Sequence, residues 1–109
     1  MSILDLANKY ITVPKNAAGI ELCEHSGVTE DENLISYSMT QNRLDEVWKT
    51  GIIDKINNEC DLLIDDFESE RIEGDNIDKC LSILSNQFDE LKEALEHAKQ
   101  LNTFVDLDF

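Results

Sequence analysis

The chain has 109 residues, of which 41% are apolar and 30% charged, and its 24 acids against 9 bases give a formal net charge of −15. This length and composition predict a single acidic helical domain over residues 1–109. The nine bases are scattered singly along the sequence. Binding to nucleic acid or to an anionic membrane needs clustered bases, so we expect neither of them as a partner. No apolar run approaches the roughly 20 residues needed to cross a bilayer.

The first part of the chain predicts a short helix followed by a loop. Ser2 is a suitable cap for a helix that extends to Ile11, and Pro14 would end it, because proline disfavours helical backbone in the residue before it. Residues 15–28 are expected to form a loop that contains a short extended piece.

The next segment supports two interpretations. Thr29 and Glu32 have the spacing of a capping box, which predicts a second short helix with apolar residues at Leu34 and Met39. However, apolar and polar residues also alternate from Ile35 to Met39, as they would in a strand. The sequence alone leaves both alternatives open.

The strongest helical pattern extends from about Asn42 to Ser69. Its apolar residues recur mostly every fourth position, which predicts one long amphipathic helix with a stripe at Leu44, Trp48, Ile52, Ile56, Cys60, Leu63 and Phe67. Gly51 lies inside this stripe and costs about 1 kcal/mol relative to alanine, so a kink or a break is expected there.

A second long helix is predicted from about Asn76 to Leu101, after a turn at Gly74. Two long helices joined by a short loop should fold back as an antiparallel hairpin, so the expected fold is mainly α, with one or two shorter N-terminal helices. The tail, residues 103–109, alternates and predicts a short strand or an extended segment. The expected core consists of Leu44, Trp48, Ile56, Leu63, Phe67, Leu84, Phe88, Leu91 and Leu95.

The sequence contains no pattern typical of catalysis or of a metal site. There is no nucleophile elbow, phosphate-binding glycine loop or dinucleotide fingerprint. Cys23 and His25 have no second pair at zinc-site spacing, and no set of ligands accompanies His97. We therefore expect no enzyme, no cofactor and no metal, with structural roles for both histidines. The chain has three cysteines, so any disulfide would leave one of them unpaired. This odd number and the lack of a secretory signal favour a reducing, cytoplasmic location.

An acidic cluster is the feature most suggestive of function. Residues 59–75 hold eight acids and only one base, Arg71. Like charges at helical spacing destabilise a helix by a few tenths of a kcal/mol each, and such a local cost often marks a functional surface. The candidate partner-binding residues are Tyr37, chosen as an aromatic anchor, and the acids Glu59, Asp61, Asp65, Asp66, Glu68, Glu70, Glu73 and Asp75. A merely solvated face is the alternative.

These features favour a non-catalytic protein that binds and neutralises a basic protein. A bacterial immunity protein or antitoxin that inhibits a nuclease-type toxin has this character, because its acids can mimic phosphates and an aromatic residue can anchor the contact. A small acidic secretion or assembly chaperone is the alternative. A metal–carboxylate enzyme is a third and weaker hypothesis.

Overall fold

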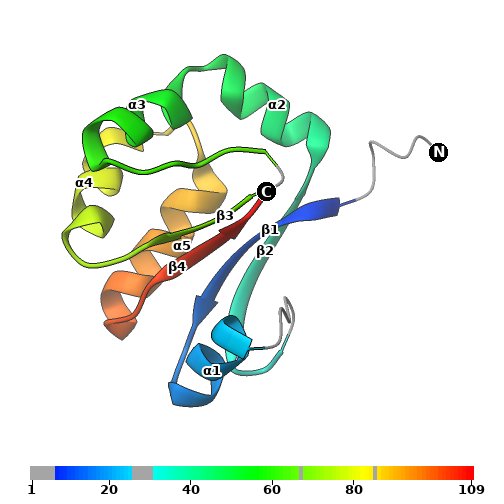
Figure 1. Ribbon diagram of the computed structural model, residues 1–109, viewed down its shortest axis with the longest axis vertical. Helices are drawn as coiled ribbons and strands as arrows, with labels where there is room; N and C mark the ends of the chain where they lie inside the picture. Colours follow the sequence, from blue (N-terminus) through cyan, green and yellow to red (C-terminus); the bar gives the residue numbers. More distant parts are fainter. Residues whose placement is uncertain (1–6, 26–30, 67, 85) are drawn as a thin grey trace.

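The computed structural model describes residues 7–25, 31–66, 68–84 and 86–109, which form an α/β fold (Figure 1). The described elements are, in chain order, β1 (Ala7–Pro14), α1 (Ala17–His25), β2 (Leu34–Thr40), α2 (Gln41–Lys49), α3 (Ile52–Cys60), β3 (Ser69–Ile72), α4 (Asp75–Leu84), α5 (Asp89–Leu101) and β4 (Val105–Asp108). Among the described helices, none is long and apolar enough to cross a membrane.

The four described strands form one antiparallel sheet in the order β2-β1-β4-β3. The central strand β1 pairs with β2 from Ala7 opposite Thr40 to Pro14 opposite Leu34. On its other side β1 pairs with β4, which brings Ile11 opposite Leu107. Since side chains alternate between the faces of a strand, these partners point to the same face.

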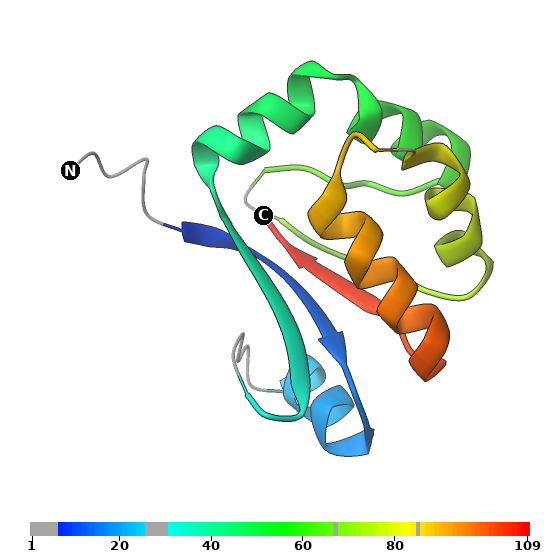
Figure 2. The same cartoon turned by 180° about the vertical axis from the view of Figure 1, so that it is seen from behind.

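The core lies between one face of the sheet and the helices α2 to α5. Ile11, Val13, Ile72, Val105 and Leu107 point into it from three strands, and all five are at most 1% exposed. Helices α2 and α5 contact β1 directly, whereas α3 lies between α2 and α4 (Figure 2). Short amphipathic helices can cover a sheet in this way because each buries only one stripe of apolar residues.

Helix α1 lies on the opposite face of the sheet and is attached there by Arg71 of β3. The Arg71 guanidinium makes two hydrogen bonds to the Asp106 carboxylate, at 2.7 and 3.2 Å, and lies 3.7 Å from the centroid of the Phe104 ring. It also forms an ion pair with Glu24 of α1 at 3.7 Å. The hydrogen bonds to Asp106 raise the pKa of Arg71 above its usual value, so the guanidinium stays charged.

Helix α1 also requires a glycine where it meets the chain that enters β2. A Cβ atom at Gly19 would overlap the Asn33 carbonyl oxygen and would touch Pro14. That carbonyl also accepts the Lys15 N–H at 2.9 Å, which limits how far it could move away. The close approach therefore depends on the missing side chain.

The predicted antiparallel hairpin of two long helices is wrong. The first predicted helix is two helices, α2 and α3, separated at Gly51, whose φ of 79° is left-handed, so the expected break is confirmed. Its last part, after Cys60, is a loop and the strand β3. The second predicted helix is also two helices, α4 and α5, and the turn before it is confirmed by the left-handed Gly74.

The N-terminal predictions are mostly wrong as well. Residues 7–14 form the central strand instead of the end of a helix, because β2 and β4 supply pairing partners that the local pattern did not reveal. Residues 17–25, expected in a loop, form α1. The strand alternative for the segment near Ile35 is confirmed by β2, and the strand alternative for the tail is confirmed by β4. The proposed caps at Ser2 and Thr29 lie outside the described residues.

Candidate functional site

The acidic cluster includes a loop, residues 61–66, that leaves the C-terminus of α3. Asp61 ends the helix by taking a left-handed conformation, with φ 56° and ψ 46°, and its N–H bonds to the Asn57 carbonyl. The Leu62 N–H bonds to the same carbonyl at 3.1 Å, as in a Schellman motif. Aspartate is one of the few residues besides glycine that tolerate this backbone.

The Asn57 side chain fixes the middle of the loop. Its Nδ2 donates to the Ile64 carbonyl at 3.0 Å, and its Oδ1 accepts the Ile64 N–H at 2.8 Å. One amide thus satisfies both main-chain groups of a residue that is only 4% exposed, much as a neighbouring strand would. Ile64 is thereby held in the core cluster.

A second anchor joins the loop to strand β3. The Glu70 carboxylate accepts the Leu63 N–H at 3.0 Å through one oxygen and the Arg71 N–H at 3.1 Å through the other. At the far end of the loop, the Trp48 Nε1 of α2 donates to the Asp66 carboxylate at 3.3 Å. The loop is therefore fixed from α2, α3 and β3, so its main chain is preorganised rather than ordered only on binding.

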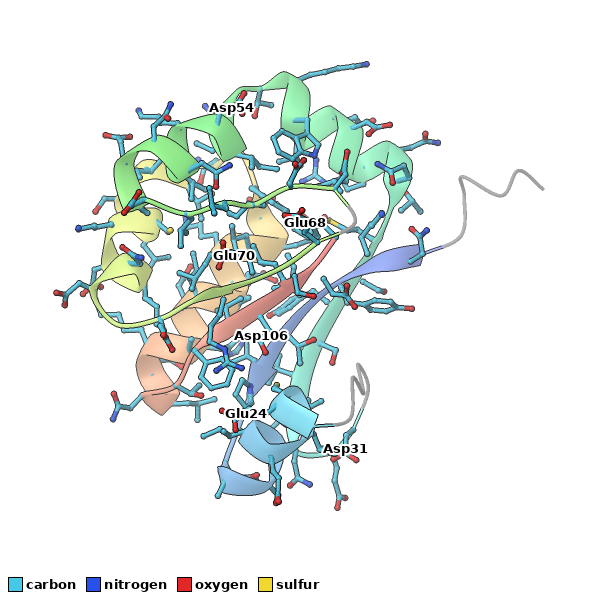
Figure 3. The ribbon with its side chains drawn as sticks, in the orientation of Figure 1. Glu24, Asp31, Asp54, Glu68, Glu70 and Asp106 are labelled. Atoms are coloured by element: carbon cyan, nitrogen blue, oxygen red, sulfur yellow. The ribbon has the colours of Figure 1, made fainter. Side chains whose placement is uncertain are left out.

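The fixed loop exposes Leu63, whose surface is 78% exposed. Beside it runs an open groove of about 650 Å³, between the loop, α2 and α3. Asp54 lies on α3 above the loop, and Glu68 lies next to β3 (Figure 3). Four of the ten residues that line the groove are acidic, and none is basic. The lining consists of Trp48, Asp54, Asn57, Asn58, Asp61, Leu62, Leu63, Ile64, Asp65 and Glu68.

Among the described residues, Arg43, Arg71 and Lys99 pair with acids outside this groove. Arg43 of α2 makes two hydrogen bonds of 2.9 Å to Glu90 of α5, which lower the pKa of the Glu90 carboxyl below its usual value. Lys99 and Asp78 pair at 2.8 Å between α5 and α4. Within the described part of the chain, no Lys or Arg lies within ion-pair distance of the groove acids. The negative charge of the groove is therefore available to a partner.

The predicted partner-binding acids are only partly brought together. Asp61, Asp65 and Glu68 line the groove, whereas Asp66 and Glu70 act as anchors of the loop. The remaining three are exposed outside the groove: Glu59 on α3, and Glu73 and Asp75 at the turn into α4.

Tyr37, the predicted aromatic anchor, is not part of this groove. It lies on β2 half-buried beside His97 of α5, with the two ring centroids 6.5 Å apart. Burial, followed by the charges of Glu93 and Glu96, raises the pKa of the tyrosine hydroxyl. Tyr37 and His97 thus pack against each other, and the groove has Trp48 as its aromatic residue instead. The side chain of His25 lies outside the described residues.

The sequence interpretation missed Trp48, Asp54, Asn57, Asn58 and Leu63 as site residues. Both Trp48 and Leu63 are part of the predicted core, but Trp48 is only half-buried and packs against the edge of the core, and Leu63 is exposed. Phe67 of the expected core lies outside the described residues. The remaining members are buried, at 1% exposure or less: Leu44, Ile56, Leu84, Phe88, Leu91 and Leu95.

In the part of the chain that the structure describes, no group of three or more His, Cys, Asp or Glu side chains is placed to hold a metal ion. No family model, curated protein or solved structure matches the chain.

Proposed function

We propose that the chain is a non-catalytic binding protein that neutralises a basic protein, in the manner of a bacterial immunity protein or antitoxin acting on a nuclease-type toxin. The observation that carries the proposal is the fixed loop, which presents Leu63 beside a groove whose charged residues are all acidic. A cytoplasmic location fits the three cysteines, which are free thiols.

A basic protein surface is the complement that this groove requires. Asp61, Asp65 and Glu68 carry charge that no described base offsets, so a partner that brings lysines or arginines gains attraction without breaking an existing ion pair. The surface of a nuclease that binds nucleic acid has this character, because it must neutralise phosphates. Carboxylates in the groove would occupy the place of those phosphates and block the substrate.

Leu63 adds an apolar contact to this electrostatic attraction. Full burial of a leucine side chain is worth about 1.5–3 kcal/mol, which corresponds to about a 10- to 100-fold change in Kd. Because Asn57 and Glu70 already fix the main chain around Leu63, little of this gain is lost in ordering the loop. We therefore place Leu63 in an apolar depression of the partner that is surrounded by bases.

The test begins with capture of the partner by the full chain from its own cell extract, at low and at high salt. The captured protein is expected to be basic, to be released by salt, and to lose nuclease activity when the chain is added. Capture of an acidic protein, of unfolded chains in general, or of a partner whose activity is unchanged would refute the proposal.

Variants of the chain then test whether the groove is the contact. We compare the double variant D61N/D65N with E73Q/D75N, which removes two charges from the same acidic cluster but outside the groove. Asparagine suits the left-handed position 61, so the loop should persist. The groove variant should weaken binding far more, and L63A should speed dissociation about 10- to 100-fold. Equal losses from the two double variants, or no effect of L63A, would show that the groove is not the contact.

A further inference from the structure

Two of the three free cysteines meet in the core, at the boundary between two helices. Cys60 is the last residue of α3, and Cys80 lies in α4. Their exposed fractions are 4% and 0%, and their Sγ atoms are 3.5 Å apart. A disulfide requires a separation of about 2.05 Å, so a shift of about 1.5 Å between α3 and α4 would close the bond.

We propose that Cys60 and Cys80 form a dithiol that hydrogen peroxide converts to a disulfide between α3 and α4. In the first step the Cys60 sulfur attacks one peroxide oxygen, the O–O bond breaks, and the oxygen that leaves takes up the Cys60 thiol proton to become water. In the second step the Cys80 sulfur displaces the hydroxyl of the resulting sulfenic acid, which leaves with the Cys80 proton as a second water. The two sulfurs are oxidised by two electrons in all, and the peroxide is reduced.

The roles of the two thiols follow from where they lie. Cys60 is the more exposed of the pair, at 4% against 0%, and it is the last residue of α3. Burial, followed by the hydrogen bond to Cys60, strongly raises the pKa of the Cys80 thiol. The raised pKa disfavours attack by Cys80 on peroxide, so Cys80 acts in the second step, in which its proton leaves with the displaced hydroxyl.

The disulfide would act on stability and on the acidic loop. It would close a loop of about 20 residues, for which the lost chain entropy of the unfolded state is worth about a 200- to 300-fold shift of the folding equilibrium. Cys60 directly precedes Asp61, so the bond would also fix the position from which the loop at 61–66 departs. This inference is independent of the proposed partner.

Cys23 supplies the internal control. It lies in α1, on the other face of the sheet, where burial and Asp106 raise its pKa to about 11. It should remain a thiol while the pair reacts. A C23S variant removes it without touching the dithiol.

The test treats the full-length C23S chain with dilute hydrogen peroxide and maps its peptides by mass spectrometry. We expect the loss of two hydrogen atoms, a crosslink between the Cys60 and Cys80 peptides, and a higher urea midpoint that a reductant reverses. The wild-type chain should give the same crosslink with Cys23 still reduced. Sulfinic acid at Cys60 without a crosslink, disulfides only between chains, or a crosslink to Cys23 would overturn the proposal, and these outcomes need no variant of the buried pair to fold.

Discussion

Replacing Asn57 with alanine should loosen the loop that carries Leu63. The substitution removes two hydrogen bonds, from Nδ2 to the Ile64 carbonyl and from the Ile64 N–H to Oδ1. Each such bond contributes about 1 kcal/mol net, and Ile64 is buried, so its main-chain groups gain no easy access to water. We expect a loss of about 2–3 kcal/mol in the free energy of unfolding, measured by urea denaturation, and faster hydrogen exchange at the Ile64 amide.

The matched control is Asn58→Ala, one residue further along the same helix. Asn58 also lines the groove, but its side chain is exposed, and alanine raises the helix propensity equally at both positions. The difference between the two variants therefore isolates the contacts to Ile64. Equal stability and equal amide exchange in both variants would refute the view that Asn57 preorganises the loop.

Three further predictions concern the fold. Leu91→Ala should cost about 2–5 kcal/mol because the side chain is fully buried, and so lower the Tm by at least about 10 °C in a thermal scan, whereas Leu101→Ala, 44% exposed on the same helix, should change it little. Gly19→Ala should destabilise by about 1–3 kcal/mol in urea, despite the gain in helix propensity, because its Cβ would overlap a main-chain carbonyl; a more stable variant would contradict this. Arg43 lowers the pKa of Glu90 in the folded state, so the pair stabilises the fold at pH values above the unfolded pKa of about 4.3, and this stability is lost as the pH falls below it. Glu90→Gln should therefore flatten the acid limb of a pH–stability curve. An unchanged limb would contradict the pairing.

The sequence predicted the faces of the elements better than their lengths. Leu84 and Phe88 are four residues apart and both buried, as in a continuous helix, yet the chain between them leaves α4 and enters α5. A four-residue apolar spacing is equally compatible with one helix and with two that share a core. Only Gly51 gave a local sign of such a break.

The pairing of the sheet could not be predicted locally. Strand β1 is central because β2 and β4 pair with it, and β4 lies nearly 100 residues away along the chain. Such pairing depends on partners distant in sequence, and a short apolar segment next to Pro14 reads equally well as the end of a helix. The two strands with clear alternation, β2 and β4, were the ones recognised as strand alternatives.

The site was predicted in its charge but not in its geometry. Acids at helical spacing, such as Asp61 and Asp65, were expected to destabilise a helix, and the chain there is indeed a loop that follows a left-handed Asp61. Leu63 falls on the apolar stripe only if the helix continues, so ending the helix converts a core residue into an exposed one. The anchoring role of Asn57 has no sequence signature, because it depends on a contact seven residues away.

The kind of contact that fixes the loop determines whether added salt would loosen it. Its anchors are hydrogen bonds that the side chains of Asn57, Glu70 and Trp48 donate or accept, and none of them is an ion pair. The bases that do form ion pairs, Arg43, Arg71 and Lys99, are paired with acids outside the groove. Screening by salt should therefore weaken the attraction between the groove acids and a basic partner while leaving the loop in place. In the proposed complex, charge would govern the encounter with the partner, and the preorganised Leu63 would govern how long the complex lasts.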